Sequence, residues 1–279
     1  MTAPATEPKA PRSKQGPVMS DEERYLFDLQ GYLVVRNALA PQTLAELLRF
    51  WNAQLRTKCL HDLSFSWGPA WQSLIDPPGT YPLIRALLHD RVRLDHAFAV
   101  DERFGNPQRR LHHHADMFHA GVFYHASMDT MHNGLLGVIY SLLAPDPSSP
   151  TFCAIPGSHK AAFPTPPRLY TIDSCPAVQA VYVEPGDAII FNEALTHGTY
   201  LPELDPNKRG ARRAIMVKYM PDSMAYREPA MWSSVTELAP TPNYEHGAWE
   251  GRVDVAALTP QQRRLVCTPP FHRNREDGR

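Results

Sequence analysis

The sequence predicts a mainly β protein with flanking helices, built as a barrel or a jelly roll. Between residues 109 and 220, short apolar runs are separated by clusters of Pro, Gly, Asp and Ser, which is the pattern of consecutive strands joined by turns. Alternating strand and helix patterns, which would indicate a parallel sheet, are not seen there. We therefore expect two facing antiparallel sheets over about residues 91–220, with helices from residues 20–90 packed outside them.

The length and composition favour one large domain behind a short leader. A chain of 279 residues with 43% hydrophobic and 10% aromatic residues can bury a full core. Residues 1–18 contain four prolines and no hydrophobic periodicity, so we expect a disordered leader there. Residues 19–279 are expected to form a single domain whose jelly-roll core spans about residues 91–220.

Charge and cysteine content exclude several classes of partner. The chain has 28 Lys and Arg against 29 Asp and Glu, a net charge of -1, which provides no basic surface for nucleic acid or an anionic membrane. No apolar segment is typical of a membrane span or a signal peptide. The four cysteines are scattered and form no CxxC motif, which fits a reducing compartment. We expect a cytoplasmic protein with a small-molecule substrate; the oligomeric state is left open.

Helix signals mark the N-terminal part of the chain. Ser20 and Glu23 form a capping box, and Gly31 ends the helix that follows. The apolar face of this helix is expected to consist of Tyr25, Leu26 and Leu29. Pro41 begins a second helix, and its apolar side chains at 3.6-residue spacing are Leu44, Leu47, Leu48, Trp51 and Leu55. Tyr81–His89 is a third helical stretch.

Strands are expected where β-branched and aromatic residues gather. The predicted strands are Tyr32–Arg36, 91–100, Leu135–Leu143, Phe152–Ile155, Val178–Val183, Ala188–Phe191 and Ala214–Tyr219. The segment Glu184–Asp187 has the residues of a tight hairpin turn, because proline presets φ and glycine supplies a positive φ. Thr259 and Pro260 begin a final helix that runs to about Val266.

A cluster of histidines indicates a metal site. Six of the 13 histidines occupy one 21-residue window, at positions 112, 113, 114, 119, 125 and 132. His114 and Asp116 are two residues apart, so on a strand both side chains project to the same face and can hold one ion. His197, which ends an apolar strand, offers a third ligand. Two histidines and one carboxylate that leave positions open form the facial triad of non-haem Fe(II) oxygenases.

A pair of arginines follows this candidate triad. Arg212 and Arg213 open a strand 15 residues after His197. Arginine binds a carboxylate bidentately, and an organic-acid cosubstrate with a distal carboxylate would need such an anchor. The alternative for these two residues is a solvated strand start.

Over residues 25–270 the chain resembles the phytanoyl-CoA dioxygenase family of Fe(II)/2-oxoglutarate oxygenases. The order and spacing of five segments carry the resemblance: DLQGYLVVRNAL, RLDHAFAV, FCAIPGSHKAAF, AIIFNEALTHGT and RRAIMVKYMP. Two features depart from the family pattern. A proline-rich turn, PDPSSP, precedes the PGSH segment where a glycine-rich turn is common, and the insert between the distal histidine and the arginines is long.

The resemblance implies a fold, a reaction and a set of site residues. The fold is a double-stranded β-helix, a cupin-like jelly roll, and the cofactors are Fe(II), 2-oxoglutarate and O2. The implied iron ligands are His114, Asp116 and His197. The implied 2-oxoglutarate contacts are Arg212, Thr199 and His96. Arg213 is expected to point away from the pocket, although the long insert leaves the register of Arg209, Arg212 and Arg213 open.

Three rival functions stay open at this point. A jelly-roll isomerase or hydrolase could use the same ligands with zinc or manganese, and it would not need Arg212. A non-catalytic binding protein could share the fold. A radical halogenase would lack the carboxylate ligand that Asp116 provides.

For the oxygenase, the segment from 117 to 135 contains only Asp129 as a charge and is rich in aromatic and sulfur side chains, which favours a small metabolite not linked to CoA. Hydroxylation, desaturation and ring chemistry are not distinguished.

Overall fold

The computed structural model describes most of the chain. The described residues are 18–55, 63–102, 110–113, 121–127, 130–143, 149–200, 212–222 and 252–266. The expected leader, apart from Val18, lies outside them, and so do His114, Asp116, His119 and Arg209.

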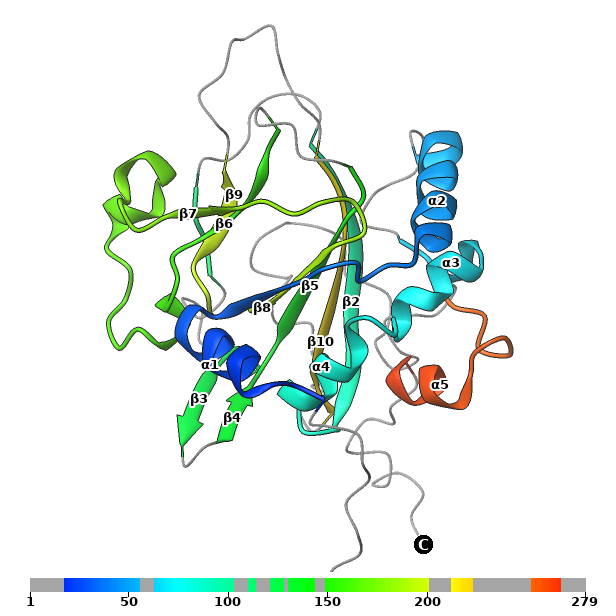
Figure 1. The fold of residues 1–279 in the computed structure, drawn as a ribbon, viewed down its shortest axis with the longest axis horizontal. Coiled ribbons are helices and arrows are strands. Elements are labelled where there is room, and N and C mark those ends of the chain that lie inside the picture. The colour runs from blue at the N-terminus through cyan, green and yellow to red at the C-terminus, as the bar shows by residue number, and fades with distance from the viewer. Residues whose placement is uncertain are drawn as a thin grey trace, which may run out of the picture.

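Two antiparallel sheets face each other and form a cupin-like jelly roll, as predicted (Figure 1). The larger sheet consists, in spatial order, of β1 (Tyr32–Val35), β8 (Ala188–Asn192), β5 (Leu136–Ser141), β10 (Arg212–Pro221) and β2 (Val92–Glu102). The smaller sheet consists of β7 (Gln179–Val181), β6 (Thr151–Ala154) and β9 (His197–Tyr200). A separate hairpin of β3 (Tyr124–Ser127) and β4 (Thr130–Asn133) projects from the barrel.

The larger sheet has one core on each face. Along β10, Ala214 and Met216 pack with the apolar side chains between the two sheets. Ile215 and Val217 point to the opposite face and pack against the helices. This alternation is the two-residue period of a strand, and each fully buried aliphatic or aromatic side chain stabilises the fold by about 1.5 to 3 kcal/mol. The interior of the barrel is therefore defined by residue parity along each strand.

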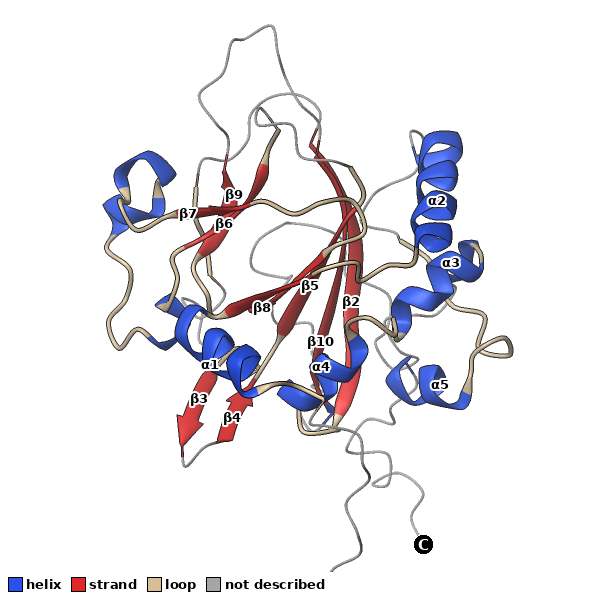
Figure 2. Cartoon of the chain, in the orientation of Figure 1, coloured by secondary structure: helices blue, strands red, loops and turns tan. Residues whose placement is uncertain are grey.

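The helices cover the outer face of the larger sheet and its edge (Figure 2). They are α1 (Asp21–Gln30), α2 (Pro41–Phe50), α3 (Pro69–Gln72), α4 (Tyr81–Leu87) and α5 (Pro260–Val266). The helix α2 continues into a π-helical turn, Trp51–Leu55. Four-residue α3 was not predicted, because so short a helix leaves no periodic pattern. Among the described residues, no helix is long and apolar enough to cross a membrane.

The capping of α1 is confirmed, but only Leu26 of its predicted apolar face packs against the core. Ser20 Oγ accepts from Glu23 N, Glu23 Oε2 accepts from Ser20 N, and Gly31 adopts a left-handed φ of 84°. The fully buried side chain is Phe27, whereas Tyr25 and Leu29 are 65% and 49% exposed. The stripe that a short helix buries depends on where it docks, here beside β1, and not on spacing alone.

The predicted core strands are found, but some strands were not predicted and one predicted hairpin turn has a different role. The hairpin β3–β4 and the strand β9 were not predicted, because the segments YHAS, TMHN and HGTY show no run of β-branched or aromatic residues. The turn Glu184–Asp187 is tight, with Gly186 at a φ of 90° and Asp187 N bonded to Glu184 O. It does not close a hairpin, because it connects β7 to β8 in the other sheet.

Candidate active site

His197 begins β9 and faces the barrel interior. Its side chain lies between the rings of Phe191 and Phe152, at centroid distances of 4.7 and 5.7 Å, and the residue is 5% exposed. Its Nδ1 lies 2.6 Å from the carbonyl oxygen of Leu195. Since a carbonyl only accepts, Nδ1 carries the proton and the lone pair is on Nε2. This backbone bond fixes the tautomer and orientation that a metal-ligating histidine requires.

The segment that leads to the predicted HxD motif runs beside β9. His112 and His197 form an antiparallel bridge, with N–O distances of 2.8 and 2.9 Å and ring centroids 4.3 Å apart. Leu111 and His113 point the other way, where Leu111 is fully buried and His113 stacks on Tyr170 at 6.0 Å. The motif residues that follow lie outside the described residues. The structure thus brings the start of the motif strand to the distal histidine.

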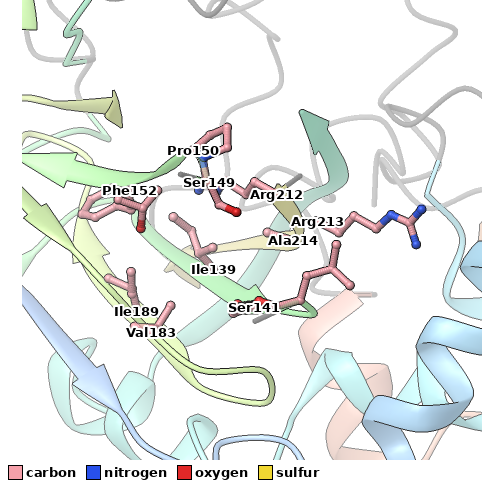
Figure 3. A pocket seen from close by; sticks show the side chains of 12 residues that line it. Ile139, Ser141, Ser149, Pro150, Phe152, Val183, Ile189, Arg212, Arg213 and Ala214 are labelled. Atoms are coloured by element: carbon pink, nitrogen blue, oxygen red, sulfur yellow. Dashed lines mark hydrogen bonds between the residues drawn. The ribbon is translucent and has the colours of Figure 1, made fainter. Parts of the chain in front are cut away.

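Arg212 and Thr199 meet inside the barrel. Thr199 is two residues after His197 on β9, and it shares the interior face. The guanidinium Nη1 of Arg212 donates to Thr199 Oγ1 at 3.0 Å. Arg212 also lines a pocket with Ile139, Ser149, Pro150, Phe152 and other residues of both sheets (Figure 3). A guanidinium and a hydroxyl group side by side form a donor pair suited to a carboxylate.

Arg213 points to the opposite face of the sheet (Figure 3). Its Nη1 donates to Asn52 Oδ1 at 2.7 Å, its Nε lies 3.5 Å from Asp101 Oδ2, and its guanidinium lies 5.8 Å from the Trp51 ring centroid. These partners belong to the outer layer and to the edge strand β2. The two neighbouring arginines therefore serve different sides of the sheet, and only Arg212 reaches the interior.

His96 lies on β2, directly opposite Lys218 of β10. It shares a face with Phe98, on which its ring stacks at 6.0 Å, and with Val100, which packs in the interior core. Its Nδ1 is 2.6 Å from Asp95 Oδ2. Burial would raise the pKa of Asp95, but the bond from His96 and the neighbouring cations lower it. The structure places His96 in the barrel interior, on a different strand from Arg212.

A buried ion pair in the interior was missed by the sequence analysis. Lys218 Nζ lies 3.0 Å from Glu193 Oε1, and the two side chains are 6% and 0% exposed. Gly137 makes room for them, because a Cβ there would lie 2.7 Å from Glu193 Oε1 and 2.4 Å from the Phe191 ring. The signal was a lysine within the apolar run AIMVKYM, since such a residue is almost never fully buried without a partner.

His159 of the PGSH segment is held in a structural environment. It lies in a short 3-10 helix, is 6% exposed, and its Nε2 is 3.1 Å from Asp28 O. Burial, together with the charge of Lys160, lowers the pKa of His159 to about 4. The imidazole is therefore neutral at pH 7 and joins α1 to the barrel.

A comparison with known protein families finds one match. The family model of phytanoyl-CoA dioxygenase (PhyH) matches residues 52–201, more than half of the chain. No curated protein sequence matches the chain.

Several solved structures share this fold. HygX from Streptomyces hygroscopicus, with nickel and 2-oxoglutarate bound, has a TM-score of 0.60 and 19% identity, covering 73% of this chain and 87% of that one. EctD from S. alaskensis, with 2-oxoglutarate and 5-hydroxyectoine, has a TM-score of 0.58 and 19% identity over 79% and 82% of the chains. The 2-oxoglutarate-dependent carbocyclase SnoK from nogalamycin biosynthesis has a TM-score of 0.55 and 17% identity, covering 81% of this chain and 93% of that one. With the family match, the chain belongs to the phytanoyl-CoA dioxygenase family and is a dioxygenase that depends on Fe(II) and 2-oxoglutarate.

Proposed function

We propose that the protein oxidises a C–H bond of a small organic metabolite that is not linked to CoA, most simply by hydroxylation. In this reaction 2-oxoglutarate and O2 are consumed, and succinate and CO2 are released. The observation that carries the proposal is the interior contact between Arg212 and Thr199, two residues along β9 from a histidine whose Nε2 is oriented for a metal.

His114, Asp116 and His197 are the proposed iron ligands. The bridge between His112 and His197 supports this set, because residues two apart on a strand share a face and His114 follows His112 by two. Two neutral imidazoles and a carboxylate suit Fe(II). When bound, iron and 2-oxoglutarate would activate O2 to supply the oxidant, and the protein's task is to orient the substrate toward it.

Arg212 and Thr199 are proposed to bind the distal carboxylate of 2-oxoglutarate, with His96 on the neighbouring wall. Two residues along a strand span about 7 Å, which suits a five-carbon dicarboxylate that reaches from the metal to the guanidinium. Thr199 can donate its hydroxyl hydrogen to the same carboxylate that Arg212 pairs with. The pocket beside Arg212 has apolar side chains, including Ile139 and Phe152, together with the hydroxyl groups of Ser149 and Thr151. The apolar part of this wall lowers the local dielectric constant and strengthens the proposed pairing.

The substrate class is argued from charge. A CoA ester carries several phosphate groups and would favour a basic surface at the mouth. The segment from 117 to 135 contains no Lys or Arg, and Lys160 beside it is paired with Asp28 at 3.1 Å. The small molecules named for HygX and EctD, hygromycin B and 5-hydroxyectoine, are likewise not CoA esters. We also propose a cytoplasmic location, which the scattered cysteines support.

A substrate screen tests the proposal. The purified protein is incubated aerobically with Fe(II) and 2-oxoglutarate, and succinate formation is compared with and without each candidate substrate. We expect stimulation by free small metabolites, such as amino-acid derivatives or secondary metabolites. Stimulation by acyl-CoA thioesters alone would refute the substrate class. Succinate release that persists unchanged in Arg212→Ala would refute the assigned role of Arg212.

A further inference from the structure

The hairpin β3–β4 leaves the barrel through a narrow neck. Leu135 N donates to Gly121 O at 2.7 Å, and Gly134 N donates to Phe123 O at 3.0 Å. A Cβ on Gly134 would lie 2.1 Å from Gly121 O, so only glycine allows this approach. The two sides of the neck are therefore in direct backbone contact.

One buried side chain grips both sides of this neck. Asn192, at the end of β8 and 0% exposed, donates from Nδ2 to Phe123 O at 3.0 Å and to Asn133 Oδ1 at 2.9 Å. Its Oδ1 accepts from Ala194 N at 2.8 Å. Asn133 in turn donates to Leu87 O at the end of α4, at 3.1 Å. The Asn192 amide is thus fully used, with two bonds to the neck and one that closes its own turn.

The same turn holds the distal histidine. Leu195 N donates to Asn192 O at 2.9 Å, and the carbonyl of Leu195 accepts from His197 Nδ1 at 2.6 Å. Glu193 N donates to Leu135 O of the neck at 3.0 Å. Leu195 therefore links Asn192 to the imidazole of His197: its N–H is bonded to the Asn192 carbonyl, and its own carbonyl is bonded to His197 Nδ1.

The Asn192 amide bonds backbone groups beside an apolar cluster. Val122, Leu135, Ala194 and Met220 form this small cluster at the neck. If Asn192 were apolar, Phe123 O and Ala194 N would lose these bonds, so part of its role is to stabilise the neck. A fully satisfied buried amide also fixes the relative position of the groups it joins.

We propose that Asn192 is a positioning residue of the metal site, which ties the neck of the β3–β4 hairpin to the turn that orients His197. The inference rests on the proposed role of His197 as an iron ligand. Asn192 itself touches neither metal nor substrate, and it acts through the carbonyl of Leu195.

The test compares Asn192→Asp with Gln262→Glu in the full-length protein. Asn192→Asp keeps the size and the acceptor for Ala194 N, but it loses both donors to the neck. Gln262 is a matched control, because it is a buried amide, 6% exposed, that donates to Asp76 Oδ1 at 2.7 Å and joins α5 to the segment after α3. Both variants lose a buried donor, but only one lies at the metal turn.

Two readouts separate positioning from general stability. Mn2+ is the metal probe, and its dissociation constant is measured by electron paramagnetic resonance without turnover. We expect about a tenfold weaker Mn2+ affinity for Asn192→Asp and less than a twofold change for Gln262→Glu, in line with the 10- to 100-fold typical of lost outer partners of a ligand. Hydrogen exchange of residues 121–135 should be faster only in Asn192→Asp. Mn2+ affinities within twofold of wild type in Asn192→Asp would overturn the inference.

Two further outcomes complete the test. If Asn192→Asp does not fold, exchange at Gly134 and Leu135 is measured in the wild type with and without Mn2+ and 2-oxoglutarate, and unchanged rates would overturn the inference. If the wild type and His197→Ala bind Mn2+ equally well, the assignment of His197 fails and the inference falls with it. A third result separates the two claims. If Mn2+ binding in the wild type depends on His197 but Asn192→Asp binds Mn2+ as tightly as the wild type, the inference about Asn192 is refuted while the assignment of His197 stands.

Discussion

Replacement of Arg212 by alanine is expected to weaken 2-oxoglutarate binding by roughly 100-fold. Arg212 contacts Thr199 at 3.0 Å in the interior and is only partly buried. Loss of a buried charge partner costs about 3 to 5 kcal/mol, and partial exposure places Arg212 at the lower end of that range. A cost of about 3 kcal/mol corresponds to roughly two powers of ten in the dissociation constant.

Arg213→Ala is the matched control, because the neighbouring guanidinium faces Asn52 and Asp101 on the outer side of the sheet. We expect it to lower the free energy of unfolding by about 1 kcal/mol and to change 2-oxoglutarate affinity less than twofold. Anaerobic calorimetric titration of 2-oxoglutarate into the Mn2+-loaded variants measures both constants. Equal losses in the two variants, or a larger loss in Arg213→Ala, would show that the interior anchor is misassigned.

Three further predictions concern stability and are checked by denaturant unfolding. Lys218→Met alone should lower the free energy of unfolding by about 3 to 5 kcal/mol, because it leaves the Glu193 carboxylate buried without the lysine. The double variant Lys218→Met/Glu193→Leu should recover most of that loss. Equal losses in the single and double variants would contradict a paired role. His159 has a pKa of about 4 in the folded protein, whereas the histidine of the unfolded chain binds a proton near pH 6.5. The free energy of unfolding should therefore fall by about 1.4 kcal/mol per pH unit as the pH drops from about 6.5 to about 4. His159→Gln should flatten this dependence on pH. Gly137→Ala should cost about 1 to 3 kcal/mol, because its Cβ would overlap the Phe191 ring; a neutral substitution would mean that the interior is loosely packed.

Local chemistry explains why much of the fold could be predicted. The capping box at Ser20 and the left-handed Gly31 depend on neighbours within four residues, and both are found. The core strands depend on apolar runs that only a two-sided sheet can bury, as the all-buried β5 and β8 illustrate. The contact between Arg212 and Thr199 followed from the family pattern, and the structure brings the two residues together.

Features set by tertiary contacts could not be predicted. The hairpin β3–β4 has no apolar run, and its neck is bound by Asn192, which is about 60 residues away in the chain. The buried face of α1 is chosen by docking, so Phe27 is buried where Tyr25 was expected. The pairing of Lys218 on β10 with Glu193, which directly follows β8, depends on the sheet order, in which one strand, β5, separates β8 from β10.

The most direct test of the central claim is iron-dependent succinate release from 2-oxoglutarate, measured for the wild type and Asp116→Ala. The reasoning predicts that the wild type forms succinate only when Fe(II) and O2 are present. Asp116→Ala should keep its fold by circular dichroism but lose both bound iron and succinate formation, because one of three protein ligands is removed. Stoichiometric iron and undiminished succinate formation in Asp116→Ala would contradict the account.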